Sequence, residues 1–200
     1  MSKTLLIIFV KNIKLGKVKT RLAKTVGNEN AFKVYKALVK VTEKATSKIN
    51  VDKRIYFSDN IVDEKWPNDY KTIQKGTDLG ERMSNAFQDG FDDGYEKIAL
   101  IGSDLPNIST KIIQDGFNEL QNNDVVFGPA EDGGYYLIGM SKFHNCIFEN
   151  KAWSTSVLLE ETLAELKQKK IEVSLIETLN DIDTFEDLQE YPKFLKLISI

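Results

Sequence analysis

The pattern of apolar and polar residues divides the chain into short apolar runs and longer amphipathic stretches. Residues Thr4–Val10 form a continuous apolar, β-branched run between lysines, which is typical of a strand buried on both faces of a sheet. From Asn28 to about Ile49 apolar side chains recur with helical spacing, and Asn28 is available as the helix cap. Similar runs predict further strands at 53–58, 71–74, 97–102, 124–127, 135–140 and 172–176. Helical spacing predicts further helices at 79–91, from Ser109 or Thr110 to Leu120, at 155–169, and from Thr184 onward.

The order of these elements predicts the fold class. Strands separated by helices imply βαβ crossovers, and therefore a mostly parallel sheet with helices on both faces. The alternation breaks at Tyr135–Met140, where a strand follows a Gly-Gly pair directly. We expect one α/β domain over residues 1–200. In such a sheet ligands bind beyond the carboxyl ends of the strands, so the loops after 4–10, 97–102 and 124–127 are the candidates for chemistry.

Composition and charge exclude several classes of protein. The chain has 27 basic and 30 acidic side chains and a formal charge of −3, so it lacks the overall positive field that drives sequence-independent nucleic-acid binding. Cys146 is the single cysteine and His144 the single histidine, which excludes an internal disulfide and a Cys/His zinc site and favours the cytoplasm. No apolar run approaches the ~20 residues of a membrane span. The first apolar run, Leu5–Val10, is also too short for a signal peptide.

The loop after the first strand is strongly basic. Residues 11–24 contain six basic side chains and no acid, although the protein as a whole is acidic. Such a loop suits a polyphosphate, whose oxygens need fixed cations and backbone N–H groups. It contains no Walker motif, and it is also compatible with a solvated surface loop in which the basic side chains remain exposed. The candidate phosphate-binding residues are Lys11, Gly16, Lys19, Thr20 and Arg21.

Acidic residues follow two other strands and precede the last helix. Asp104 comes directly after a buried strand, where its carboxylate can hold a divalent ion or cap a turn. Glu131 and Asp132 precede the Gly-Gly pair and are candidates for a metal ligand and a general base, or for a polar turn. Asp181 and Asp183 are two residues apart, which places both carboxylates on one side of an extended segment. Helix capping explains either aspartate equally well. They are candidates for the metal site only because Asp104 is also present.

These motifs together resemble one bacterial family. It is the glycosyltransferase-like group of the nucleotide-diphospho-sugar transferase superfamily known as selenodomain-associated or arsenosugar-biosynthesis transferases. The resemblance runs in order from about Thr4 to Leu188 and rests on the basic loop, Leu79–Met83, Ile101–Pro106, Gly128–Gly139 and Asp181–Thr184. It implies a GT-A-like, Rossmann-type three-layer α/β/α sandwich that binds a nucleoside di- or triphosphate with Mg²⁺ or Mn²⁺.

A shorter resemblance leaves the reaction class open. The run Lys19-Thr20-Arg21-Leu22 is similar to the corresponding loop of phospholactate guanylyltransferases, which transfer a nucleotidyl group. The sequence also departs from the family pattern, since Ile13 replaces the usual proline of the basic loop. Asp104 lacks the second acid of a D-x-D motif, which weakens the argument for sugar transfer.

The sequence therefore predicts a metal-dependent transferase that uses a nucleotide sugar or a nucleoside triphosphate and a small-molecule acceptor. Lys19 and Arg21 would hold the phosphates, and Asp104 would hold the metal. Asp183, with Asp181 as the less favoured alternative, would complete the metal shell or orient the acceptor, and Asp132 or Glu131 would activate the acceptor. Glycosyl transfer is the preferred reaction, nucleotidyl transfer with release of pyrophosphate is the alternative, and a nucleotide-binding module without turnover is the alternative of another class. Aromatic residues that can stack on a base or sugar, or simply pack in the core, are Trp66, Tyr70, Tyr135, Tyr136 and Trp153.

Overall fold

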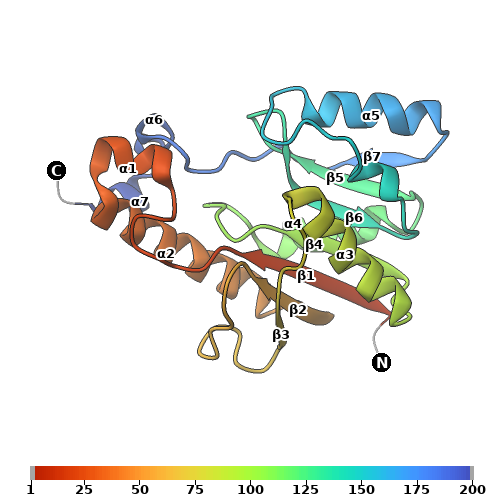
Figure 1. Cartoon of the computed structure of the whole chain (residues 1–200), viewed down its shortest axis with the longest axis horizontal. Coiled ribbons are helices and arrows are strands. Elements are labelled where there is room, and N and C mark those ends of the chain that lie inside the picture. Colours follow the sequence, from red (N-terminus) through yellow and green to blue (C-terminus); the bar gives the residue numbers. More distant parts are fainter. Residues whose placement is uncertain (1–2, 199–200) are drawn as a thin grey trace.

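A computed structural model describes residues 3–198, in which seven strands form one mixed sheet in the order β3-β2-β1-β4-β6-β5-β7 (Figure 1). Strand β6 pairs antiparallel with both of its neighbours, whereas all the other strand pairs are parallel. The predicted mostly parallel sheet, with its break after the Gly-Gly pair, is thereby confirmed. The strands are β1 (Thr4–Val10), β2 (Asp52–Phe57), β3 (Tyr70–Ile73), β4 (Lys97–Ile101), β5 (Val125–Pro129), β6 (Tyr135–Met140) and β7 (Val173–Leu175).

The helices follow the predicted spacing, with two corrections at their first residues. Gly27, not Asn28, is the N-cap of α2, and Asn28 is the first residue of that helix. The helix expected from residue 155 begins at Leu158, after the positive-φ residue Ser154 and an exposed segment. The helices are α1 (Thr20–Val26), α2 (Asn28–Thr46), α3 (Leu79–Asp92), α4 (Thr110–Glu119), α5 (Leu158–Gln168), α6 (Phe185–Gln189) and α7 (Pro192–Leu195), with a short 3₁₀ turn at Asn145–Ile147.

Strand β1 shows why the protein forms three layers. Its side chains alternate between the two faces of the sheet, with Leu6 and Ile8 in one core cluster and Leu5 and Ile7 in the other. Helices α2 and α4 pack on the first face, while α3 and α5 cover the second. Because both faces are covered, the strand reads in sequence as an uninterrupted apolar run.

A helical lobe projects beyond the carboxyl end of β1 (Figure 1). It consists of α1, α6, α7 and the N-terminal half of α2, which share a third hydrophobic cluster around Leu22, Leu38, Ile182 and Phe194. Helix α1 was not predicted, because its few apolar residues lie within the basic loop and its seven residues are too short for a clear helical pattern. Its buried Leu22 packs into the lobe, so tertiary contacts stabilise it.

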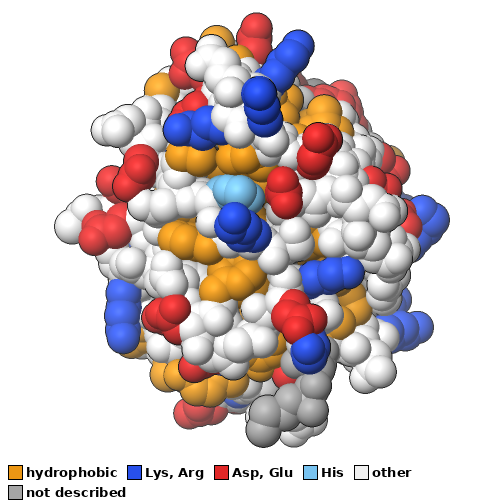
Figure 2. Space-filling view, turned by 90° about the vertical axis from the view of Figure 1, so that its right-hand side faces the viewer, with side chains coloured by type: hydrophobic (Ala, Val, Ile, Leu, Met, Phe, Trp, Pro, Cys, Tyr) orange, Lys and Arg blue, Asp and Glu red, His pale blue; other side chains and the backbone are white. Residues whose placement is uncertain are grey.

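The surface opposite the lobe carries no large patch of one charge. On this face acidic and basic side chains are interspersed around small hydrophobic areas (Figure 2). In residues 3–198 no helix combines the length and the apolar character needed to cross a membrane.

Candidate functional site

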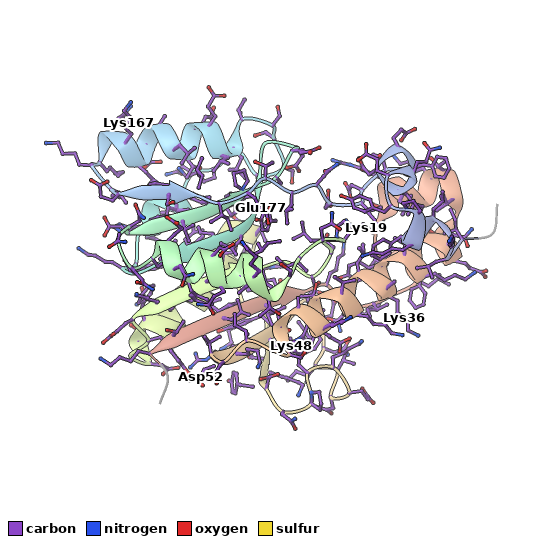
Figure 3. All side chains as sticks on the ribbon, turned by 180° about the vertical axis from the view of Figure 1, so that it is seen from behind. Lys19, Lys36, Lys48, Asp52, Lys167 and Glu177 are labelled. Atoms are coloured by element: carbon purple, nitrogen blue, oxygen red, sulfur yellow. The ribbon has the colours of Figure 1, made fainter. Side chains whose placement is uncertain are left out.

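The candidate site lies where the helical lobe meets the carboxyl ends of the strands. Lys19, at the beginning of α1, lies between the lobe and the sheet (Figure 3). Asp104 follows β4, and the segment with Asp181 and Asp183 runs from the sheet into α6. Segments from the beginning, middle and end of the chain therefore meet at one edge of the sheet, as expected for this class of fold.

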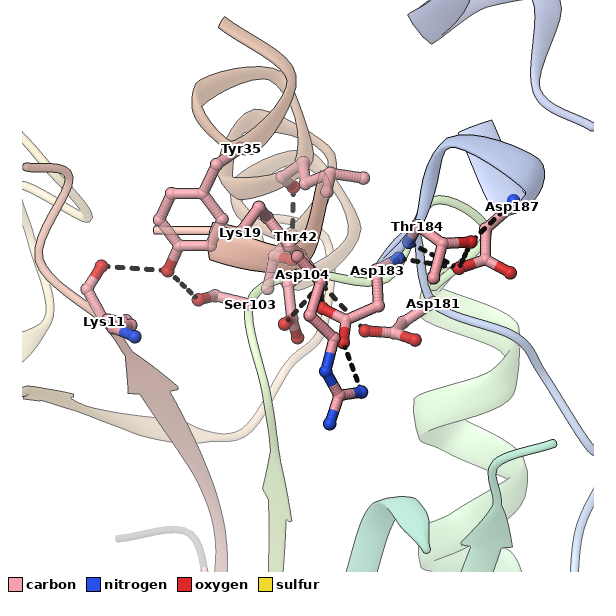
Figure 4. Close-up of polar contacts among 12 residues, drawn as sticks. Lys11, Lys19, Tyr35, Thr42, Ser103, Asp104, Asp181, Asp183, Thr184 and Asp187 are labelled. Atoms are coloured by element: carbon pink, nitrogen blue, oxygen red, sulfur yellow. Dashed lines mark hydrogen bonds and ion pairs between the residues drawn. The ribbon is translucent and has the colours of Figure 1, made fainter. Parts of the chain in front are cut away.

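The side chain of Lys19 lies among three carboxylates (Figure 4). Its Nζ is 3.0 Å from Asp104 Oδ2, 2.8 Å from Asp181 Oδ2 and 3.4 Å from Asp183 Oδ1. The side chain is only 4% exposed, so for Lys19 the alternative of a solvated, exposed side chain is wrong. Burial by itself lowers the pKa of Lys19, but the three carboxylates outweigh burial and raise the pKa above its ordinary value. Lys19 is therefore a fixed positive charge, and it holds the three acids together.

The backbone on both sides of this cluster is fixed locally. Lys19 precedes the first turn of α1 with φ 45°, a left-handed conformation that costs energy for a residue with a side chain. On the opposite side Thr184 and Asp187 form a capping box, and the N–H of Asp183 donates to Asp187 Oδ2 at 3.0 Å. The capping box thus sets the position of Asp183 relative to Lys19.

A cationic cleft opens beside the cluster. Arg21 is 67% exposed, and its Nη1 donates to Asp183 Oδ2 at 3.0 Å. The cleft has a volume of about 690 Å³, which is sufficient for a nucleotide. Its polar walls include Lys11, Thr20, Arg21, Ser58, Gln74 and Arg82, and Lys19, Asp104 and Asp183 also line it.

The wall between β1 and β4 is fixed by a buried tyrosine. Tyr35 Oη donates to the carbonyl oxygen of Lys11 at 2.8 Å and is 3.2 Å from Ser103 Oγ (Figure 4). Burial raises the pKa of Tyr35 to about 12, so the hydroxyl remains protonated and keeps both contacts at neutral pH. The loops that carry Lys11 and Asp104 are therefore tied to α2.

A smaller acidic cavity adjoins the cationic cleft and shares Asp104 with it. Asp132 and Asp181 also line this cavity, together with aromatic residues that include Trp153. Asp132 Oδ1 accepts a hydrogen bond of 2.9 Å from the N–H of Gly134, so the turn before β6 fixes its carboxylate.

Two of the predicted site residues, Gly16 and Glu131, lie outside both the cationic cleft and the acidic cavity. Gly16 has φ 73° and is close to Asn28, and it lines neither the cationic cleft nor the acidic cavity. Glu131 is exposed and also lines neither of them. Asp132 is thus the member of the acidic pair that faces the site.

Several site residues were missed by the sequence reasoning. Arg82, Gln74 and Ser58 line the cationic cleft but come from three separate segments. Arg82 lies within the Leu79–Met83 motif, and that motif was the one signal in the sequence that pointed to it. Asp181, taken as the less favoured of two aspartates, makes the shortest contact with Lys19.

The carboxylate oxygens of the site are ligands of the kind that a hard divalent cation prefers. Asp104 and Asp183 are 41% and 34% exposed, and both offer carboxylate oxygens near the cleft. Within residues 3–198, however, no three acidic, histidine or cysteine side chains are already arranged around a common metal position. The carboxylates converge on the ammonium group of Lys19 instead.

Comparison with known proteins places the chain in a family. The model of the family DUF2064, described as an uncharacterized protein conserved in bacteria, matches residues 42–155. A solved structure from Desulfovibrio desulfuricans G20, provisionally described as a nucleotide-diphospho-sugar transferase, is 36% identical. The match covers 96% of this chain and 88% of that chain, with a TM-score of 0.89. The chain belongs to the DUF2064 family. The predicted resemblance to the nucleotide-diphospho-sugar transferase superfamily is thereby confirmed, and none of the curated proteins matches the chain in sequence.

More distant structures support the fold of this DUF2064 protein. A nucleotidyl transferase from Methanothermobacter thermautotroptrophicus is 11% identical over 96% of this chain and 98% of that chain, with a TM-score of 0.60. The inositol-1-phosphate CTP transferase from T. maritima is 16% identical over 100% and 98% of the two chains, with a TM-score of 0.57. At such low identity these matches show the fold alone, and they agree with the predicted GT-A-like α/β/α sandwich.

Proposed function

We propose that this protein transfers a glycosyl group from a nucleotide-diphospho-sugar to a small-molecule acceptor, with the help of Mg²⁺ or Mn²⁺. The observation that carries the proposal is the placement of the cationic cleft and the acidic cavity on either side of Asp104. The cationic cleft suits the phosphates of the donor, and the acidic cavity suits the acceptor that reacts with the donor. Membership of the DUF2064 family, through a relative described as a nucleotide-diphospho-sugar transferase, supports the same reaction class.

The phosphates would be bound by Lys11, Arg21 and Arg82. These side chains line the cleft, and a guanidinium group can bind phosphate oxygens in a bidentate manner. Their charge would stabilise the diphosphate as it leaves, which is usually a large contribution in such reactions. Thr20 would donate a hydroxyl hydrogen bond, and Lys19 would keep the acidic residues in place beside the phosphates.

Asp104 and Asp183 would hold the divalent ion, because they are partly exposed carboxylates at the boundary between the two sites. When bound, the ion supplies positive charge to the phosphate oxygens. Asp132 would accept the proton of the acceptor hydroxyl group, since its carboxylate lines the acidic cavity and is held by Gly134. Glu131, which is exposed outside the cavity, is the weaker candidate for this role.

The charge balance of the site favours glycosyl over nucleotidyl transfer. Three carboxylates surround Lys19, and one of them also pairs with Arg21. This internal neutralisation leaves less free positive charge than the six basic residues of the loop indicate. A nucleoside diphosphate leaving group therefore suits the site better than a pyrophosphate.

Nucleotidyl transfer is the second candidate, because the Lys19–Leu22 run is similar to the loop of guanylyltransferases. The two reactions release different products, so a product assay separates them. The protein is incubated with Mn²⁺ and a panel of nucleotide sugars, and in parallel with nucleoside triphosphates and phosphorylated acceptors. We expect free nucleoside diphosphate from at least one nucleotide sugar and no pyrophosphate. Acceptor-dependent release of pyrophosphate would instead establish nucleotidyl transfer.

A binding module without turnover is tested in the same samples. Nucleotides that bind the folded state raise the melting temperature, and at equal concentration the nucleotide that binds more tightly raises it more. If a nucleotide with Mn²⁺ raises the melting temperature but neither product forms with any acceptor, the protein is a nucleotide-binding module. If the proposal is correct, the nucleotide that binds most tightly is the same nucleotide that is carried by the sugar donor that the protein consumes.

A further inference from the structure

The acidic cavity has the opposite charge to the cationic cleft beside it. Its volume is about 270 Å³, close to the lower end of the range for small-molecule sites. Among the described residues that line it, Asp104, Asp132 and Asp181 are charged, and there is no lysine, arginine or histidine. The basic residues of the site line the cleft, and one of them, Lys19, contacts Asp104 and Asp181 from that side, which leaves the cavity with a net negative charge.

The remaining wall of the acidic cavity is largely apolar and aromatic. It includes Phe9, Leu79, Met83, Tyr135, Tyr136 and Trp153. The hydroxyl group of Tyr135 is buried and has no hydrogen-bond partner among residues 3–198, which is costly for a buried polar group. Burial also raises the pKa of Tyr135, so this hydroxyl remains a donor. Because Tyr135 is one of the residues that line the cavity, an oxygen or nitrogen atom of a bound molecule is the hydrogen-bond partner that we infer for this hydroxyl.

Close packing fixes the shape of this wall. Gly133 has φ 87°, and a Cβ atom there would lie 1.9 Å from the carbonyl oxygen of Ser156. The carbonyl of Gly133 accepts a 3.0 Å hydrogen bond from the N–H of Leu159, so the turn with Asp132 is fixed to the beginning of α5. A Cβ atom at Gly80 would lie 2.6 Å from the ring of Trp153, which therefore packs directly on α3. The cavity is thus built before any ligand binds.

We propose that the acidic cavity binds the acceptor, and that this acceptor is a neutral or cationic hydroxyl compound with an apolar face and no phosphate, sulfate or carboxylate. An anionic group would enter a small space in which Asp104 and Asp181 share one cation, Lys19, and Asp132 has no basic partner among the lining residues, so the net charge is negative and repels it. The aromatic wall would pack on the apolar face of the acceptor, and Tyr135 would hydrogen-bond to it. This inference rests on the proposed function, because it assigns the donor phosphates to the cationic cleft.

The same arrangement defines the transfer step. The acceptor oxygen forms a bond to the anomeric carbon of the sugar as the bond from that carbon to the diphosphate oxygen breaks. The electron pair of the broken bond leaves with the nucleoside diphosphate, and the hydroxyl proton passes to the carboxylate of Asp132. Asp132 Oδ1 is already used by Gly134, so Oδ2 is the atom that would receive the proton.

Fluorescence quenching tests the charge of the cavity without any donor or acceptor. Trp66 is 4% exposed, so ionic quenchers report mainly on the partly buried Trp153. We expect Cs⁺ to quench better than I⁻ by at least about twofold, after each is normalised to free tryptophan amide. Asp132→Asn should reduce this ratio. The matched control Asp115→Asn removes the same charge from α4, on the other face of the sheet, and should leave the ratio unchanged. A ratio near one in the parent protein would overturn the proposal.

Matched acceptors test the chemistry directly. Diphosphate release from the nucleotide sugar that binds is measured with glycerol and glycerol 3-phosphate, and with glucose and glucose 6-phosphate. We expect the neutral member of each pair to accelerate release at least tenfold more than its phosphate ester. Faster release with a phosphate ester would overturn this inference while leaving the proposed function intact. If calorimetry shows no nucleotide binding at all, the proposed function fails, and the quenching ratio still decides the charge of the cavity.

Discussion

At the scale of single residues, Lys19 has the largest effect on the site. Its ammonium group contacts Asp181, which is 162 positions away in the sequence, and also Asp104 and Asp183. Without this cation, three carboxylates would face one another across a partly buried space. Lys19 therefore contributes to the stability of the fold as well as to the charge of the cationic cleft.

Replacing Lys19 with alanine should destabilise the protein by about 2–3 kcal/mol. This is less than the loss for a fully buried ion pair, because the three carboxylates remain about a third or more exposed. Urea unfolding of the variant and the parent measures the difference. Lys17→Ala, at an exposed position just before α1, is the control and should change stability little. Equal stability of the parent and Lys19→Ala would show that the cluster is not stabilising.

A second substitution separates the charge from the backbone. Lys19→Gly removes the same ammonium group but adopts φ 45° without strain. We expect it to be more stable than Lys19→Ala and less stable than the parent. In both variants Mn²⁺ should raise the melting temperature more than in the parent, because the carboxylates have lost their internal cation.

Arg21 should behave differently, because its side chain is 67% exposed. Arg21→Ala should change the free energy of unfolding by less than about 1 kcal/mol, the usual range for an exposed ion pair. It should weaken nucleotide binding by about 1.5–3 kcal/mol through loss of a charge-assisted phosphate contact. Calorimetry with Lys24→Ala as the control measures this, since Lys24 is exposed on the same helix and does not line the cleft. Unchanged affinity in Arg21→Ala would remove Arg21 from the phosphate site.

At the scale of elements, the short helix α6 determines where Asp183 lies. Asp187 Oδ2 accepts hydrogen bonds from the N–H groups of Asp183 and Thr184 and from the Thr184 hydroxyl. Partial burial raises the pKa of Asp187, but these hydrogen bonds outweigh it and lower the pKa below its ordinary value. The ionised carboxylate is therefore the form that stabilises the helix start.

Asp187→Ala should lose about 1 kcal/mol of stability at neutral pH, as is usual when a capping side chain is removed. A lowered pKa stabilises the fold above the ordinary carboxyl pKa of about 4, and this stabilisation is lost as pH falls through the lower folded value. The difference between parent and variant should thus be constant from pH 7 to pH 5 and shrink below about pH 4. Unfolding at several pH values measures it. Glu186→Ala, an exposed neighbour, should show no such trend.

At the scale of the whole molecule, the site depends on the packing of the helical lobe. Ile182 is fully buried in the lobe and lies in sequence between Asp181 and Asp183, two of the three aspartates that contact Lys19. Ile182→Ala should destabilise the protein by about 2–5 kcal/mol through lost burial and a cavity. It should also weaken nucleotide binding at temperatures where the protein is still folded. Leu175→Ala, at a position 50% exposed in β7, should do neither, and equal effects of the two variants would contradict this dependence.

The sequence by itself determined the sheet, the main helices and the approximate place of the site. Buried strands such as Thr4–Val10 are readable because both faces are covered, and α3 and α4 are readable because one face of each is buried. Asp104, Arg21 and Asp132 were found because they follow or precede recognisable strands and helices. The single domain and the cytoplasmic location, inferred from length and cysteine content, stay predictions.

Only the tertiary structure decided how these residues are paired. Lys19 looks like one of six exposed basic residues in sequence, and its burial comes from carboxylates far away along the chain. Helix α1 forms because Leu22 packs against the lobe, and Arg82 and Trp153 reach the site because α3 and the segment before α5 fold towards it. Local patterns report the burial of one element, whereas charge pairing and cavity walls depend on contacts between distant segments. These contacts exist only once the chain has folded.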